Sequence, residues 1–186
     1  LHVDWRIPNG LLERILALFF VAAAGSGLIG IYIARRYARM LTRRTEEVVL
    51  ERIPQFIAQL RQQAEAVALE SAAETGSSTI ADFYGGQLAD YFARPRHMWL
   101  HLQGSRRAYF ALMTELTSMT RYLNDQEMIQ AEKLRALVER KNRLDYAHAL
   151  QSVLKAWLFV HIPATYGLIL LTLLHLLLVY SFGGAR

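Results

Sequence analysis

The 186-residue sequence contains no cysteine and only four prolines. The absence of cysteine excludes disulfide bonds, Cys-ligated zinc, iron–sulfur clusters held by this chain, and covalent haem attachment through a Cys-x-x-Cys-His motif. Any metal must therefore be held by histidine, carboxylate or methionine side chains. No Walker motif occurs in the sequence, and we expect no flavin or nucleotide chemistry on this chain.

Charged side chains are missing from two long blocks of the sequence. Residues 15–34 form a block of 20 residues, and residues 156–185 a block of 30, without Asp, Glu, Lys or Arg. An α-helix needs about 20 apolar residues to cross the hydrocarbon core of a bilayer. Buried helices of soluble domains seldom run so long without a charge. We therefore expect an all-α membrane protein with two transmembrane helices flanking a helical domain.

The expected organisation has five parts. They are an outer-face N-terminal segment at 1–10, a first transmembrane helix at 11–34, a cytoplasmic helical domain at 35–155, a second transmembrane helix at 156–182, and an outer-face tail at 183–186. The chain starts at Leu1 without methionine and ends in Gly-Gly-Ala-Arg. We therefore expect it to be a piece of a longer polypeptide.

Basic residues set the expected orientation in the membrane. The first apolar block is followed closely by five arginines, namely Arg35, Arg36, Arg39, Arg43 and Arg44, whereas only Arg186 follows the second block. Cytoplasmic flanks of membrane helices carry an excess of Lys and Arg, so the middle domain is expected in the cytoplasm, at a bacterial-type inner membrane. The arginines are also expected to contact anionic lipid. Aromatic residues expected at the membrane boundaries are Trp5, Trp157 and Tyr180.

The middle domain is expected to be helical almost throughout, because no strand-like alternation of useful length occurs. Expected helices cover 46–74 with Pro54 near a bend or start, 79–92 opened by a Thr79/Asp82 cap, 105–122 capped by Ser105, and the chain from about Gln126 into the second span. A net charge of +5 is too dilute for a nucleic-acid surface. Instead, a docking surface for an acidic redox partner, or an ordinary solvated surface, is expected at Arg106, Arg107, Lys133, Arg135, Arg140 and Lys141.

The second apolar block contains two histidines, His161 and His175. On an ideal helix, 14 residues fall about 40° short of four full turns and span about 21 Å, so both imidazoles share one face at different depths. A polar side chain inside a membrane span is costly and should have a partner. Neutral imidazole is a common axial ligand of haem iron. We therefore predict that both histidines bind haem iron.

This pattern resembles membrane-bound diheme b-type cytochromes, in which histidines at about this spacing bind one haem toward each side of the membrane. The resemblance covers mainly residues 157–181. Weaker support comes from Gly25, Gly27 and Gly30, which would let a porphyrin or another helix approach the first span. The resemblance implies one or two haem b groups. It also implies ligands from another chain or from the flanks, because the family uses two histidines per haem and the first block contains none.

Four further histidines are secondary candidates. His2 is expected on the outer side. His148 precedes His161 by 13 residues on the inner side, but lies about 140° around an ideal helix. His97 and His101 stand at i and i+4, a spacing that can bind a metal from one helix face. No third ligand is evident for that pair, and simple packing is the alternative.

Three functions remain open at this point. The first is a membrane electron-transfer subunit, a non-catalytic component of an oxidoreductase complex, which relays electrons between a quinone or soluble partner and another cofactor. The second is a two-span signalling or scaffold protein without a cofactor. The third is a transport or assembly subunit that relays protons or metal ions. In a cofactor-free protein, each membrane histidine would bond a carbonyl or a Ser/Thr of a neighbouring helix.

Overall fold

The computed structural model describes residues 10–44, 49–95, 98–103 and 105–182, with the backbone alone for residues 37–44 and Trp99. These residues form helices and contain no strand, so the expected all-α fold is confirmed for the described part of the chain. The chain divides into two compact units. The unit that we call the helix pair comprises residues 1–39 and 153–186, and the unit that we call the bundle comprises residues 40–152.

Two long helices, α1 (Leu11–Arg44) and α7 (Asp125–Phe182), supply the helix pair. Each is long and apolar enough to cross a membrane, by length and composition. Only 11% of the most apolar window of α1 and 6% of that of α7 are buried inside the protein. α1 continues to Arg44, past residue 34, where the first transmembrane helix was expected to end.

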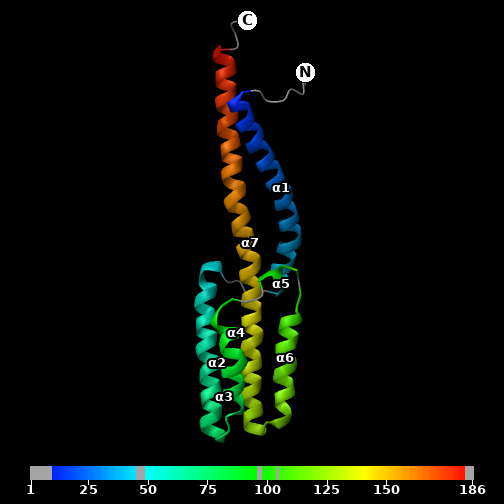
Figure 1. Ribbon diagram of the computed structural model, residues 1–186, viewed down its shortest axis with the longest axis vertical. Helices are drawn as coiled ribbons and strands as arrows, with labels where there is room; N and C mark the ends of the chain where they lie inside the picture. The colour runs from blue at the N-terminus through cyan, green and yellow to red at the C-terminus, as the bar shows by residue number, and fades with distance from the viewer. Residues whose placement is uncertain (1–9, 45–48, 96–97, 104, 183–186) are drawn as a thin grey trace. The chain divides into compact units, whose positions relative to one another are not determined.

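Within the pair the two helices run antiparallel and side by side (Figure 1). Gly167 of α7 lies against the Phe19 ring, and Gly30 of α1 lies against the Trp157 ring. Between these two contacts, Ser26 bonds His161. Residue numbers therefore rise along α1 as they fall along α7.

Buried and half-buried residues of the pair recur at alternating steps of three and four. In α1 they include Leu12, Leu16, Phe19, Ala23, Ser26, Gly30 and Ile33, and in α7 Trp157, His161, Ala164, Leu168, Leu171, His175 and Leu178. This is the seven-residue repeat, with about 3.5 residues per turn, of helices that pack side chains into one another's gaps. We call these positions the seam. Because 14 residues make two such repeats, both histidines belong to it.

The bundle is built from several shorter helices and the first part of α7. They are α2 (Ile53–Thr75), α3 (Thr79–Phe83), a π-helical turn (Tyr84–Leu88), α4 (Ala89–Ala93), α5 (Met98–Leu102) and α6 (Arg107–Met119), with single 3₁₀ turns at Leu50–Arg52 and Thr120–Tyr122. Figure 1 shows α2, α6 and the first part of α7 running along one another.

Gly and Pro residues mark several ends of these helices. Pro54 lies in the first turn of α2, where its missing N–H leaves no bond unmade. Gly76 follows the last residue of α2 with a φ of 68°, a conformation that glycine adopts without strain. The chain is extended at Arg94, before Pro95, and α4 ends there.

Three local predictions were wrong. The helix expected over 46–74 begins at Ile53, after a 3₁₀ turn, and residues 46–48 of that range lie outside the described part. The helix expected over 79–92 is interrupted by the π-helical turn. Thr79 does not cap it; the Ser78 hydroxyl donates to Asp82 Oδ2 at 2.7 Å instead.

A capping box begins α7. The backbone N–H of Glu127 donates to Asn124 Oδ1 at 2.8 Å, and the Asn124 N–H donates to Glu127 Oε2 at 2.9 Å. The two residues thus satisfy donors that a helix start leaves unpaired. Hydrogen bonds from Ser77 and Asn124 also lower the pKa of the Glu127 carboxyl.

One hydrophobic core holds the bundle together. Its fully buried side chains come from α2, α3, the π-helical turn, α4 and α7, and include Ile53, Ile80, Leu88, Phe92 and Leu134. In α2 the buried positions Ile53, Ile57, Leu60, Ala64 and Ala68 repeat at steps of three and four, so one face of that helix packs inward.

Lys141 is fully buried beside this core, which corrects its expected place on a docking surface. Its ammonium donates to Asp145 Oδ2 and, at 3.0 Å, to the Arg94 carbonyl oxygen. It also lies 4.2 Å from the centroid of the Tyr91 ring. These partners offset the cost of burying the charge. Burial and the Asp145 charge raise the pKa of Tyr91.

Candidate functional site

His161 lies on the seam and is bound by α1. Its Nδ1 is 2.8 Å from the Ser26 hydroxyl oxygen. That hydroxyl donates to the Ala23 carbonyl oxygen at 3.1 Å. With the hydroxyl proton used there, the oxygen can accept a proton from His161 Nδ1. In the tautomer that makes this bond, the lone pair lies on Nε2, for which the described residues show no hydrogen-bond partner.

Trp157, one helical turn before His161, fixes the imidazole from its own helix. The two rings stack at a centroid distance of 5.1 Å and an interplanar angle of 15°. The indole Nε1–H donates to the backbone carbonyl of Ser26 at 2.8 Å. Gly30 makes room for the indole, because a Cβ on Gly30 would overlap its atoms. Ser26 therefore binds both rings, one through its hydroxyl and the other through its backbone.

Gly27 completes this cluster. A Cβ added to Gly27 would lie 3.8 Å from His161 Cε1, an ordinary contact distance. We call Ser26, Gly27, Gly30, Trp157 and His161 the seam cluster. It holds one imidazole in a single orientation, with one nitrogen bonded and the other carrying a lone pair. Such an imidazole can ligate iron or accept a proton.

His175 lies in a more open part of the helix pair. It lines two open cavities of about 480 and 570 Å³, and Glu13 of α1 lines both. The remaining lining is mostly apolar, and in the first cavity it consists of Leu16, Ala17, Phe20, Leu168 and Thr172. An imidazole and a carboxylate in an apolar cavity can exchange a proton or bind a polar headgroup.

The two histidines share the face of α7 that meets α1, but they do not meet each other. Along an ideal helix they are separated by about 21 Å. Among the described residues, no group of three or more His, Asp or Glu side chains is placed to hold a metal ion. The helix pair therefore offers a single imidazole at each of two positions along its length, one at His161 and one at His175.

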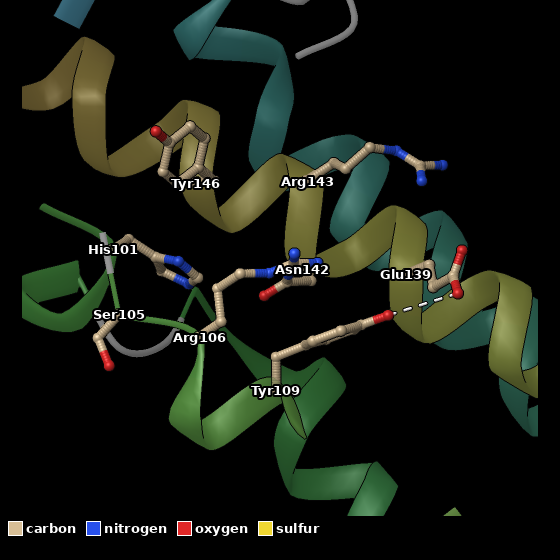
Figure 2. A pocket seen from close by; sticks show the side chains of 8 residues that line it. All are labelled: His101, Ser105, Arg106, Tyr109, Glu139, Asn142, Arg143 and Tyr146. Carbon is tan, nitrogen blue, oxygen red and sulfur yellow. Dashed lines mark hydrogen bonds between the residues drawn. The ribbon is translucent and has the colours of Figure 1, made fainter. Parts of the chain in front are cut away.

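The remaining histidines lie in the bundle or outside the described residues. His148 is half-buried on α7, and burial lowers the pKa of its imidazole, which favours the neutral form. His101 of α5 is buried, with its ring edge-on to Tyr146 at 6.0 Å. It lines a cavity of about 340 Å³ within the bundle (Figure 2). His2 and His97 lie outside the described residues, so the structure describes no His97–His101 pair.

The roles of Ser26 and Trp157 were not expected from the sequence. Trp157 was expected at a membrane boundary, and the structure shows in addition that its indole donates to α1 and stacks on His161. The signal that could have revealed both residues is the seam repeat, which places Ser26 and Gly30 on one face of α1. The glycines of α1 were noted, and of these Gly30 faces Trp157 while Gly25 has open space beside it.

Comparison with family models, curated proteins and solved structures finds no match to this chain.

Proposed function

We propose that the helix pair spans a membrane and that the chain is an electron-transfer subunit that binds b-type haem through His161 and His175. The membrane part of the proposal is supported by apolar side chains that face outward. Leu18 is 66% exposed, Phe159 83% and Leu177 62%. Side chains of this kind, repeated along two long helices, are stable in hydrocarbon and unfavourable in water.

The proposed orientation places the bundle in the cytoplasm. Arg35 and Arg36 are exposed at the end of the apolar part of α1, where basic residues mark the cytoplasmic side of a span. A reporter fused in the turn at Ser77 should be active only as a cytoplasmic reporter. Activity of a periplasmic reporter at the same position would contradict the orientation.

One observation carries the haem proposal: the hydrogen bond of His161 Nδ1 to Ser26. Metal-bound histidines almost always donate their second nitrogen to a protein acceptor, which fixes the ring for ligation. His161 would hold one group through Nε2, and His175, beside its apolar cavities, would hold another. Haem supplies a one-electron carrier to such a site, while the protein supplies ligands and a dry environment.

Within the helix pair, His161 and His175 would each supply one imidazole nitrogen to hold a haem group. The described residues of the helix pair contain no histidine besides His161 and His175. A bis-histidine site would need a second imidazole from outside these residues, which supports a place for the chain within a larger redox complex. Quinone is a proposed partner, and the cavities beside His175 and Glu13 have the apolar lining that its tail would need.

A cofactor-free scaffold is the second candidate, and the seam cluster favours it. Stacking on Trp157 and bonding to Ser26 account for the presence of His161 without any ligand. In this function the two histidines and Trp157 only hold two membrane helices together, and the bundle binds a protein partner.

The test is a haem assay on the chain isolated from its native membranes in mild detergent, so that partner subunits stay bound. We expect a b-type α band in the reduced-minus-oxidised spectrum. His161→Ala and His175→Ala should each lower the haem content, whereas the bundle variant His148→Ala should not. Unchanged haem in both membrane variants, or no haem in the native complex, would favour the scaffold instead.

A further inference from the structure

The bundle contains a polar cavity that the proposed electron transfer does not use. Residues from the α5–α6 segment and from α7 line it, namely His101, Ser105, Arg106, Tyr109, Glu139, Asn142, Arg143 and Tyr146, and its volume is about 340 Å³. In Figure 2 the side chains of His101, Arg106 and Asn142 point toward one another. Ligand sites are concave and carry a few converging polar groups.

Arg106 is the best-placed cation of this cavity. Its guanidinium lies 5.3 Å from the centroid of the Tyr109 ring and 5.0 Å from that of Phe110. These contacts hold the side chain by cation–π attraction without neutralising its charge. No acidic side chain of the described residues forms an ion pair with Arg106. The guanidinium is thus ordered and available to an anion.

Further donors surround the guanidinium. Arg106 is the residue before α6, so the N-terminus of a 13-residue helix begins beside it, with the Arg107 N–H donating to Ser105 Oγ at 3.5 Å. The N-terminus of such a helix favours a negatively charged ligand. Asn142 adds an amide and His101 adds an imidazole, whereas the Ser105 hydroxyl accepts from the Arg107 N–H and points away from these groups in Figure 2. Arg143 extends away from these groups in Figure 2 and adds positive charge at the rim.

Glu139 limits the other end of the cavity. Its carboxylate accepts a hydrogen bond from the Tyr109 hydroxyl at 3.4 Å. Burial and the Glu139 charge raise the pKa of Tyr109, so the phenol stays protonated as the donor. A ligand with negative charge throughout would be repelled at this end. The cavity therefore suits a molecule with one anionic end.

We propose that this cavity binds the phosphate group of a small ester or of a lipid headgroup. The donor set exceeds what the two oxygens of a carboxylate accept and matches the three oxygens of a phosphate monoester. The site lies wholly in the bundle and does not depend on haem in the helix pair.

The test uses the full chain in detergent micelles and in nanodiscs. Glycerol 3-phosphate is the soluble probe, measured by calorimetry, and nanodiscs of phosphatidylcholine with or without phosphatidic acid present the lipid probe. We expect saturable binding that weakens about tenfold or more in Arg106→Gln, because a charge-assisted hydrogen bond is lost. Arg143→Gln should weaken binding less. Arg107→Gln, next in the chain and outside the cavity lining, should not change it.

Arg106→Lys separates positioning from charge. It keeps the positive charge but loses the planar fork, so its affinity should fall between those of the wild type and Arg106→Gln. Binding of glycerol 3-phosphate in micelles would identify a free ester, and binding only with phosphatidic acid would identify a lipid headgroup. Absence of saturable binding to both probes would overturn the proposal. An equal loss in Arg107→Gln would also overturn it, by showing nonspecific attraction.

Discussion

The bundle buries its large apolar side chains, whereas the helix pair exposes many of its own on the outer surface. In the bundle, Phe92 and Leu134 are fully buried and face other helices. In the helix pair, Phe159 and Leu177 face outward, and the positions between the helices hold Gly30 and Ser26. The bundle is thus stabilised by removing apolar area from water. In the proposed membrane setting, the pair would rely on close backbone approach and polar bonds.

The same difference explains how each unit holds its polar groups. The bundle buries Lys141 with a carboxylate and a carbonyl in reach. The helix pair keeps His161 at its seam with a hydroxyl from the opposite helix. In water a bond between exposed polar groups contributes little, but between membrane helices it helps to choose the partner face. Substitutions in the bundle should therefore act mainly by changing the burial of apolar area. Substitutions in the helix pair should act mainly by changing close packing and hydrogen bonds between the two helices.

The largest expected effect is that of Phe92→Ala in the bundle. Removing a fully buried ring leaves a cavity and should lower the free energy of unfolding by about 3–5 kcal/mol. Hydrogen exchange of α2 and α6 amides measures this loss. Phe110→Ala, at a ring that is 55% exposed, should cost about 0.5 kcal/mol or less. An equal loss of protection in the seam residues of α1 would break the comparison, by showing that both units open together.

Gly30→Val should produce the next largest effect, this time in the helix pair. The new Cβ would overlap the Trp157 ring, so the indole must move and its bond to Ser26 must break. Overpacking of this kind costs about 1–3 kcal/mol. The measurement is an SDS titration followed by Trp157 fluorescence, with Trp5 and Trp99 replaced by Phe. Gly25→Val, with open space beside it, serves as the control and should unfold like the parent.

Ser26→Ala sharpens the comparison by removing only the polar link. The hydroxyl bond to His161 is lost while the Trp157 bond to the Ser26 backbone remains. We expect a loss of about 0.6–2 kcal/mol in the same SDS titration. Thr172→Ala is the matched change, because its hydroxyl bonds only the Leu168 carbonyl of its own helix. If both variants unfold alike, the seam bond contributes no stability.

The smallest effect is a dependence of the bundle on pH. Burial lowers the pKa of His148 from its ordinary 6.5. The unfolded chain then binds more protons below that pH, so the bundle should lose stability as the pH falls from about 6.5 toward the lowered pKa. Amide exchange at pH 7 and pH 5.5 measures the slope. His148→Gln should flatten it, and an unchanged slope would assign the dependence to other groups.

Much of the fold follows from local residues in the sequence. Pro54 in the first turn of α2 and Gly76 after its last residue act through backbone preferences that extend over only a few residues, although the expected helix began too early, at residue 46. The π-helical turn at Tyr84–Leu88 was missed, since helix-forming residues surround it and only packing selects it. Lys141 was placed on the surface because a lone charged residue gives no sign of partners such as Arg94, which lies 47 residues earlier in the chain.

The candidate site was predicted only in part for a similar reason. A spacing of 14 residues predicts a common face for His161 and His175, but not what that face touches. The structure brings Ser26 to His161 across 135 residues of chain, and stacks Trp157, one turn earlier on the same helix, on the imidazole. The same spacing equals two seven-residue repeats of the seam, so helix packing alone also places the two histidines on one face. The spacing is therefore weaker evidence for haem than the sequence suggested.

The buried position of Lys141 also has a consequence for chemical labelling. An amine with no exposed surface that already donates to Asp145 and to the Arg94 carbonyl cannot be acylated by a reagent dissolved in water. Lys133, on the same helix, is exposed and reacts at once. Acylation at position 141 therefore proceeds only as fast as the bundle opens. The rate of Lys141 acylation thus measures the rate of that opening without any substitution in the chain.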